Sequence, residues 1–473
     1  MISLADVERS SVLILGLARE GISSYRFLRS RFPEKPLGLA DRLVWEELDP
    51  DIRETLGADD KLVFHLGANY LDSLGHYELI FKAPGISPLV AEVVEAVREG
   101  RQFSSNTELF FQYAPGIIVG ITGTKGKSTT TSLIHHVLQV GGIDARLTGN
   151  IGSAPLSSLA DASAGTLFVA ELSSHQLMPL QQSPHIAVVQ NVVPEHLDYY
   201  GSFDAYLRAK ENIVRYQGAG DRVVYNALYP IPTGMAKLSP GSKMPFGVVG
   251  RDETGCLLRD DFLVFRSEGC EERIVCRAEV PLKGDFNLQN VMPGVVVGKL
   301  FGLDAETIAR AVRTFRPLAH RLEPVGEWNG ISFYNDSLST VPEAAAAALE
   351  SFAGRAVVLI AGGTDRGLEF SVLARAILAA RVRGLVLFPP TGERIWEALV
   401  RASPSQKGLP EHVLVDSMAE AVREAVGMAR EGDVVLMSPA SASFGLFRDY
   451  RDRGDRFRAE VKKLVASASP RAA

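Results

Sequence analysis

The chain has 473 residues, 46% of them hydrophobic and 22% charged, a composition typical of a globular protein and unlike that of disordered or collagen-like chains. At roughly 150 residues per domain, this length predicts about three domains. Lysine and arginine number 50 against 56 acidic residues, so the net charge of −6 offers no basic field for nucleic acid or an anionic membrane.

Cysteines and apolar runs indicate the compartment. The three cysteines, Cys256, Cys270 and Cys276, form no C-x-x-C pair, and their odd number argues against a disulfide framework or structural zinc. The N-terminal apolar run is short and enters a glycine turn, so it predicts a first strand and not a signal peptide. No apolar stretch approaches the roughly 18 to 20 residues of a membrane span. We therefore expect a cytoplasmic protein without nucleic-acid or membrane partners. We also expect it to be a monomer.

Short β-type runs alternate with helix-length segments along most of the chain, which predicts an α/β fold. Strands are predicted at 11–15, 37–40, 62–65 and 79–82, then at 117–121, 167–171 and 186–190, and finally at 356–361, 384–388, 413–415 and 434–437. Between about Met244 and Val280 the runs become short and alternating, which predicts a small antiparallel sheet. The expected domains are a Rossmann-like domain at 1–113, a central P-loop domain at 114–316 that carries the antiparallel sheet, and a second Rossmann-like domain at 317–473.

The run GITGTKGKST at 120–129 follows an apolar strand and precedes a helical segment. In such a run, glycines let backbone N–H groups close around phosphate oxygens, and the helix N-terminus adds its dipole. Lys127 can reach the outer phosphates and Ser128 can ligate Mg²⁺, although Ile121 replaces the first glycine of the usual pattern. The alternative is a glycine-rich turn that binds no nucleotide.

Two polar side chains follow neighbouring predicted strands. Glu171 ends the strand 167–171, and His196 lies in the loop after the next strand. Alone, they would be a helix cap or surface charge and an ordinary loop histidine. Because ligands gather at the carboxyl ends of parallel strands, we favour a functional role for both. Lys210, in the helical stretch that follows, has the composition of a solvated surface residue.

The first predicted strand runs into Gly16, Ala18 and Gly21, a variant of the dinucleotide fingerprint, with Asp41 at the end of the second strand. A dehydrogenase would need glycine at Ala18 for close approach to a pyrophosphate, and a uridine nucleotide is equally permitted. In the third domain, hydroxyl-rich 438–444 follows a strand and could bind a carboxylate or only cap a helix.

In their order, these segments resemble the Mur ligase family of peptidoglycan synthesis, in particular its glutamate-adding members. The matching segments are 120–129, ELSSHQL at 171–177, NVVPEHLD at 191–198, the Arg-Ala-Lys that ends at 210, NLQN at 287–290, HRLE at 320–323, YNDS at 334–337, AGGTDRG at 361–367 and SPASASF at 438–444. The resemblance implies ATP and two Mg²⁺ ions as cofactors, and UDP-N-acetylmuramoyl-L-alanine and glutamate as substrates.

The resemblance also implies roles for single residues. Those of catalysis are Lys127, Glu171, His196, Lys210 and Arg321. ATP would be bound by Gly123, Thr124, Lys125, Gly126, Lys127, Ser128, Thr129, Asn290, Arg321 and Asp336. Metal ligands would be Ser128, Glu171, His196 and a carbamylated Lys210. The UDP substrate would contact Gly16, Ala18, Arg19, Gly21, Asp41 and Asn150, and glutamate would contact Thr340, Arg366, Ser443 and Tyr450. Carbamylation needs a neutral amine, so the site should lower the pKa of Lys210.

Other readings stay open. Folylpolyglutamate synthetases share the central loop, but we do not expect them to show the N-terminal fingerprint or SPASAS. A nucleotide-dependent ATPase would leave Glu171, His196, Lys210 and Asp336 without a role, and a dehydrogenase would use only the first domain. Leu338 stands where the family commonly has lysine, which changes how the amino acid's α-carboxylate is held. Both D- and L-glutamate are therefore candidates, with D-glutamate favoured.

Overall fold

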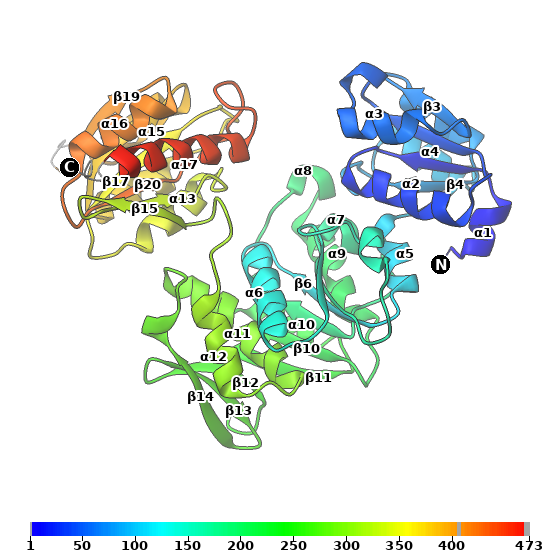
Figure 1. The fold of residues 1–473 in the computed structure, drawn as a ribbon, viewed down its shortest axis with the longest axis horizontal. Coiled ribbons are helices and arrows are strands. Elements are labelled where there is room, and N and C mark those ends of the chain that lie inside the picture. Colours follow the sequence, from blue (N-terminus) through cyan, green and yellow to red (C-terminus); the bar gives the residue numbers. More distant parts are fainter. Residues whose placement is uncertain (1, 404–407, 468–473) are drawn as a thin grey trace, which may run out of the picture. The chain divides into compact units, whose positions relative to one another are not determined.

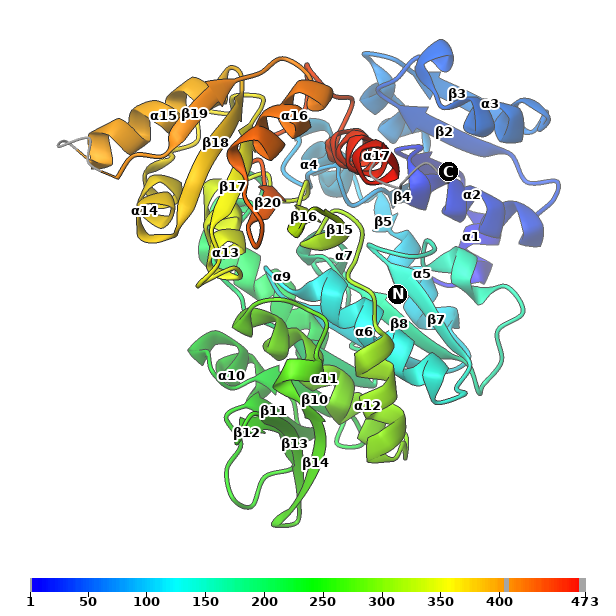
Figure 2. The same ribbon diagram turned by 60° about the vertical axis from the view of Figure 1, so that its left-hand side comes forward.

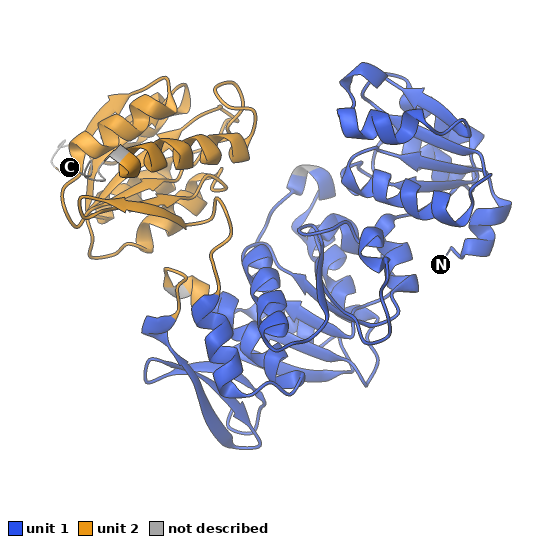
Figure 3. Cartoon of the chain, in the orientation of Figure 1, with its two compact units in different colours: residues 1–279, 289–314 blue, residues 280–288, 315–473 orange. Residues whose placement is uncertain are grey.

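The computed structural model describes residues 2–403 and 408–467. The chain forms two compact units, one of residues 1–279 and 289–314 and the other of residues 280–288 and 315–473 (Figure 3). Both units have an α/β fold, with three sheets of five, nine and six strands (Figure 1). The predicted fold class is thus confirmed, while the division into three domains stays a prediction.

The five-stranded sheet of the first unit is parallel throughout, in the order β3-β2-β1-β4-β5. Its strands are β1 (Val12–Leu15), β2 (Leu37–Asp41), β3 (Leu62–Leu66), β4 (Leu79–Lys82) and β5 (Gln102–Ser104), and its helices are α1 (Leu4–Arg9), α2 (Arg19–Arg31), α3 (Pro50–Gly57), α4 (Ala91–Arg98) and α5 (Asn106–Tyr113). All four residues of β1 are buried because alternate side chains pack into different hydrophobic clusters on the two faces.

The nine-stranded sheet has the order β14-β13-β12-β11-β10-β9-β6-β8-β7. Its parallel strands are β6 (Ile117–Thr122), β7 (Ala145–Gly149), β8 (Leu167–Glu171), β9 (Ile186–Val189), β10 (Arg222–Asn226) and β11 (Ser242–Gly247). The edge strands β12 (Gly255–Arg259), β13 (Phe262–Ser267) and β14 (Cys270–Cys276) pair antiparallel with one another. The expected antiparallel region is therefore part of this sheet and starts at β12, since β11 pairs in parallel with β10.

Helices α6 (Lys127–Val140), α7 (Ser174–Leu177), α8 (Leu197–Tyr200), α9 (Phe203–Arg215), α10 (Pro230–Ala236), α11 (Asp285–Leu300) and α12 (Ala305–Thr314) accompany this sheet. One hydrophobic cluster includes Ile14 and Leu39 of the first sheet and Phe168 and Val189 of the second. The two sheets of the first unit therefore share a continuous apolar core.

The six-stranded sheet of the second unit has the order β15-β16-β20-β17-β18-β19. Its strands are β15 (Glu323–Trp328), β16 (Ile331–Asn335), β17 (Val357–Gly362), β18 (Val382–Phe388), β19 (Glu411–Leu414) and β20 (Val434–Met437). Helices α13 (Pro342–Glu350), α14 (Ser371–Ala379) and α15 (Thr391–Ala402) bury one face, and α16 (Met418–Met428) and α17 (Tyr450–Ser467) bury the other (Figure 2). The antiparallel hairpin β15–β16 was not predicted from the sequence.

The cysteines are free, and only Cys256 is fully buried. Within the described residues, no helix has both the length and the apolar character needed to cross a membrane.

Candidate active site

Four loops of the first unit meet at one edge of the nine-stranded sheet. Strands β7, β8, β6 and β9 are neighbours and run in parallel, so their carboxyl ends lie together. These ends carry Asn150, Glu171, the glycine-rich loop and the segment 191–196. The structure thus brings together residues that lie about 75 positions apart in the chain.

The glycine-rich loop joins β6 to α6, and Lys127 is the first residue of that helix. Gly126 has a φ of +83°, and a Cβ there would lie 2.3 Å from Oδ1 of Asn290, so only glycine fits. The Thr124 N–H donates to the Asn191 carbonyl (2.7 Å), and Lys127 Nζ donates to the Thr124 carbonyl (3.0 Å). The loop is held by the protein, and Asn290 lies beside it, while the contact of Asn290 with ATP stays a prediction.

A network of side-chain amides, which the sequence did not predict, supports the glycine-rich loop. Gln190 Nε2 donates to the hydroxyl of Thr130 (2.8 Å) and to the carbonyl of Gln289 (3.0 Å). Asn226 Nδ2 donates to Gln289 Oε1 (3.0 Å). These bonds connect α6, β9, β10 and α11. No local sequence pattern predicts contacts of this kind.

Glu171 is 1% exposed at the end of β8. Its Oε1 accepts a hydrogen bond from Asn150 Nδ2 (2.9 Å), while among the described residues none bonds to Oε2. A buried carboxylate oxygen without a partner is costly, and it is a ligand that Mg²⁺ prefers. Asn150 orients Glu171, and its predicted contact with the UDP substrate stays a prediction.

Lys210 is also buried, at 1% exposure, which excludes the surface reading. From α9 its ammonium donates to the Gly123 carbonyl (2.9 Å) and the Thr122 hydroxyl (3.3 Å) and lies 4.9 Å from the ring centre of Tyr206. Burial, followed by the charge of Lys127, lowers the pKa of Lys210 well below its ordinary value. The site therefore favours the neutral amine that carbamylation requires.

His196 is the left-handed residue, with a φ of +55°, that precedes α8. Its side chain is 48% exposed, and its Nε2 lies 3.9 Å from Glu195, which also pairs with Lys125 at 3.2 Å. In the part of the chain that the structure describes, no three His, Cys, Asp or Glu side chains form a ready metal site. The donor set at this edge nevertheless fits Mg²⁺, because Glu171 offers an unused oxygen and Ser128 offers a hydroxyl.

The predicted UDP-contact residues other than Asn150 lie at the carboxyl edge of the five-stranded sheet. The Asp41 carboxylate accepts the Leu17 N–H (2.6 Å), so it holds the turn after β1. A Cβ on Gly21 would lie 1.9 Å from the Gly16 carbonyl oxygen, which explains the third glycine of the fingerprint. Arg19 reaches across to the carbonyls of Gly149 and Gly152 after β7. Substrate contact by these residues stays a prediction.

The second unit contains Arg321 and Asp336. Asp336 is 3% exposed, and its two oxygens accept bonds from the Leu322 N–H (3.1 Å) and the Ser438 hydroxyl (2.8 Å). Burial raises its pKa to about 6, against these hydrogen bonds and the charge of Arg321. The segments 320–323, 334–337 and 438–444 therefore converge on Asp336, while its contact with ATP stays a prediction.

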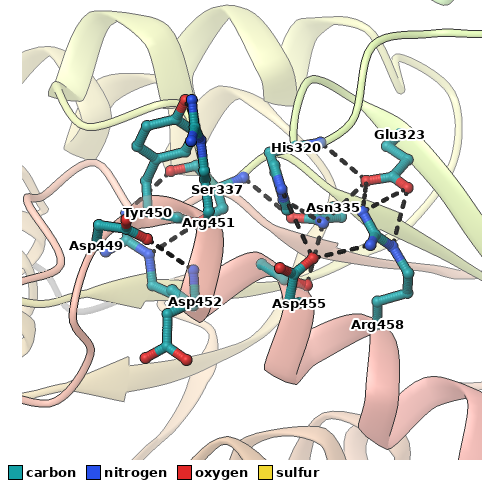
Figure 4. A network of polar contacts seen from close by, with 12 residues as sticks. His320, Glu323, Asn335, Ser337, Asp449, Tyr450, Arg451, Asp452, Asp455 and Arg458 are labelled. Atoms are coloured by element: carbon teal, nitrogen blue, oxygen red, sulfur yellow. Dashed lines mark hydrogen bonds and ion pairs between the residues drawn. The ribbon is translucent and has the colours of Figure 1, made fainter. Parts of the chain in front are cut away.

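Helix α17 holds these segments in place, which the sequence did not reveal (Figure 4). Arg458 grips Glu323 at 3.0 and 3.1 Å, and Asn335 Nδ2 also donates to Glu323 (3.0 Å). Arg453, which is 0% exposed, donates to the hydroxyl and carbonyl of Ser337 (both 3.0 Å) and to the Ser441 carbonyl (3.0 Å). The sequence does not indicate that Arg453 is buried, because an arginine within a highly charged helix is usually a surface residue.

The predicted glutamate contacts are also in the second unit. Ser443 is buried, whereas Arg366 is exposed with its guanidinium 5.4 Å from the ring centre of Phe444. Tyr450 begins α17, and its carbonyl accepts the Ser337 hydroxyl (2.7 Å). Thr340 precedes α13 and donates its N–H to the Leu338 carbonyl (3.0 Å). Their contact with glutamate stays a prediction.

Two family models match the chain. The Mur ligase middle domain matches residues 121–298, and the Mur ligase glutamate ligase domain matches residues 320–441. The first covers the glycine-rich loop, Glu171 and Lys210, and the second covers Asp336. The chain belongs to the Mur ligase family.

Curated relatives agree over nearly the full length. The UDP-N-acetylmuramoylalanine–D-glutamate ligase of Acetivibrio thermocellus is 35% identical over 97% of both chains. The UDP-N-acetylmuramoyl-L-alanine–L-glutamate ligase of Xanthomonas oryzae pv. oryzae is 36% identical over 96% of this chain and 95% of its own. Relatives named for D-glutamate and relatives named for L-glutamate are thus both similar to this chain.

Solved structures share the fold. The UDP-N-acetylmuramate-alanine ligase MurC from Thermotoga maritima superposes with a TM-score of 0.59 at 18% identity, over 96% of this chain and all of that chain. The MurF ligase from Thermotoga maritima in complex with ADP superposes with a TM-score of 0.57 at 15% identity, over 97% of this chain and 95% of that chain.

Proposed function

We propose that this chain is the ATP-dependent, ADP-forming ligase that adds glutamate to UDP-N-acetylmuramoyl-L-alanine in peptidoglycan precursor synthesis. The observation that carries the proposal is one sheet edge that joins a phosphate-binding loop, an unsatisfied buried carboxylate at Glu171 and a buried lysine at Lys210. Relatives with this activity in their names match the chain over nearly its whole length.

Within this proposal, the loop 123–129 cradles the ATP phosphates, and Lys127 neutralises charge on the transferring phosphoryl group. Glu171, Ser128, His196 and carbamylated Lys210 would hold Mg²⁺, which neutralises phosphate charge when bound. Arg321, Asp336 and Asn290 contribute to ATP binding. The residues at the edge of the five-stranded sheet bind the UDP moiety.

The reaction proceeds in two steps. The carboxylate of the L-alanyl group attacks the γ-phosphorus of ATP, which forms an acyl phosphate and releases ADP. The amine of glutamate then attacks the acyl carbon, loses a proton, and expels inorganic phosphate as the amide forms. Lys127 and Arg321 stabilise negative charge in both steps, and exclusion of water protects the acyl phosphate from hydrolysis.

An assay of phosphate release tests this function. We expect release that requires ATP, Mg²⁺, UDP-N-acetylmuramoyl-L-alanine and glutamate together. Release that is indifferent to the sugar nucleotide and the amino acid would instead indicate a nucleotide-dependent ATPase. Reduction of a nicotinamide cofactor without phosphate release would indicate a dehydrogenase.

We propose D-glutamate as the preferred amino acid, with L-glutamate as the second candidate because a similar relative is named for it. A panel that includes both enantiomers, with UDP-N-acetylmuramoyl-L-alanine fixed, decides between them. We further propose that the enzyme is a cytoplasmic monomer, that its domains divide near residues 113 and 316, and that two Mg²⁺ ions take part.

A further inference from the structure

Tyr199 connects the two sheets of the first unit. It lies on α8, three residues after His196, and its hydroxyl lies within hydrogen-bond distance of the carbonyls of Pro84 (3.2 Å) and Ile86 (3.3 Å). Both carbonyls belong to the loop 83–86 that follows β4 of the five-stranded sheet. A single phenol donor thus reaches the backbone of a loop that lies 113 to 115 positions earlier in the chain.

The loop 83–86 is in turn fixed to the predicted nucleotide turn. Its Ala83 N–H donates to the Leu15 carbonyl (2.8 Å), and a Cβ on Gly16 would lie 2.8 Å from the Cβ of Ala83. Lys82 Nζ donates to the Ile86 carbonyl (2.6 Å), the same acceptor that faces Tyr199. The turn at Gly16, Ala83 and the Ile86 carbonyl thus form a chain of neighbouring groups that ends at Tyr199.

His175 continues the contact toward His196. Its ring centre lies 4.2 Å from that of Tyr199, at an interplanar angle of 88°, and 5.0 Å from that of His196, at 64°. Both are edge-to-face arrangements, which are attractive between aromatic rings. His196 has a half-exposed side chain and a left-handed backbone that is unfavourable for a residue other than glycine, so its position depends on such neighbours.

We propose that Tyr199 and His175 are positioning residues that couple the loop 83–86 to His196, so that sugar-nucleotide binding at the first sheet sets the place of the histidine. This inference rests on the proposed ligase function. Neither residue touches the reacting atoms in this scheme. A purely structural role would instead affect both substrates alike.

The first test is Tyr199→Phe, which keeps the ring and removes only the hydroxyl. We expect KM for UDP-N-acetylmuramoyl-L-alanine to rise about fivefold, as for loss of one hydrogen bond, with KM for ATP unchanged. Tyr206→Phe is the matched contrast, because the Tyr206 hydroxyl lies 2.9 Å from Thr124 Oγ1 in the phosphate loop and its loss should raise KM for ATP. Tyr216→Phe is the control, because Tyr216 is exposed at the C-terminal end of α9. It should change neither the KM for UDP-N-acetylmuramoyl-L-alanine nor the KM for ATP.

The second test is His175→Ala, which we expect to lower kcat about tenfold. His175→Phe should restore most of that loss, because an edge-to-face contact requires a ring and not an imidazole. A wild-type protein without ligase activity would overturn the proposed function itself. An active wild type whose Tyr199→Phe variant has unchanged constants, or raises both KM values equally, would overturn the coupling and leave the function standing.

Discussion

Two buried carboxylates, one in each compact unit, are in opposite states. Glu171 ends β8 and Asp336 follows β16, and both are at most 3% exposed. Both oxygens of Asp336 accept hydrogen bonds, whereas Oε2 of Glu171 has no partner among the described residues. A satisfied carboxylate fastens segments together, and an unsatisfied one is held ready for a cation.

Two buried cations, Arg453 in the second unit and Lys210 in the first, differ in the same way. Arg453 is held by four hydrogen bonds to Ser337, Ser441 and Ala442, and Lys210 by two bonds to Gly123 and Thr122. Arg453 therefore completes a scaffold. Lys210 keeps bonding capacity and a lowered pKa, as a modified or catalytic lysine requires.

The largest expected effect concerns the glycine-rich loop, which lies at the same sheet edge as Glu171. Lys127→Ala should lower kcat by about 10³-fold or more with the fold intact, because a cation that follows the phosphoryl group is lost. Steady-state assays with circular dichroism measure this. Lys237→Ala is the control, since Lys237 is an exposed lysine at the C-terminal end of α10 and its loss should cost far less. Near-normal turnover of a folded Lys127→Ala protein would remove the nucleotide assignment.

Lys210→Ala tests whether Lys210, unlike the structural Arg453, takes part in catalysis. We expect a loss of about 10²-fold in kcat, partly restored by acetate or formate, which would replace the oxygen ligands of a carbamate. Mass spectrometry of the intact protein under bicarbonate checks the modification itself. Full activity of the alanine variant would contradict a catalytic role.

The two carboxylates can be compared directly through stability in urea without divalent cations. Asp336→Ala should lower the free energy of unfolding by about 2 to 4 kcal/mol, because it strands the Leu322 N–H and the Ser438 hydroxyl. Glu171→Ala should change it by less than about 1 kcal/mol, since an unsatisfied buried charge disappears. Equal losses of unfolding free energy in both variants would contradict the distinction between a structural carboxylate at Asp336 and a carboxylate free to bind a cation at Glu171.

Arg366→Ala tests whether the exposed edge of the second unit binds the amino acid. We expect KM for glutamate to rise about tenfold and KM for UDP-N-acetylmuramoyl-L-alanine to stay constant, because a bidentate carboxylate contact is lost. Arg375→Ala, another exposed arginine of the same unit, is the control. Equal changes in both constants would argue against glutamate binding by Arg366.

The smallest effect concerns Glu108 on α5, a half-buried carboxyl whose partial removal from water raises its pKa to about 7. Above this pH the folded protein holds a charged, poorly solvated carboxylate, so the stabilisation present below its ordinary pKa of 4.5 is lost as the pH rises through 7. Glu108→Gln should raise the free energy of unfolding by about 1 to 2 kcal/mol near pH 8, and hardly at all near pH 4.5. A gain that is independent of pH would refute this reading.

The sequence predicted most of the sheets, because buried parallel strands are short apolar runs between turn residues. It also located Glu171, His196 and Lys127, which follow such strands. It could not show that Lys210 is buried, that Gln190 and Asn226 support the glycine-rich loop, or that Arg453 joins two loops. These facts depend on contacts between distant segments, which leave no local pattern.

Strand β14 ends the nine-stranded sheet and has consequences for association. An edge strand exposes unpaired backbone groups to which another chain can add. Here the edge carries exposed Glu271, Glu272 and Arg273, and Lys299 of α11 clamps Glu272 at 2.6 Å. A second copy that paired with β14 would have to bury these charges. The charged edge therefore protects the folded protein against strand-mediated aggregation at high concentration.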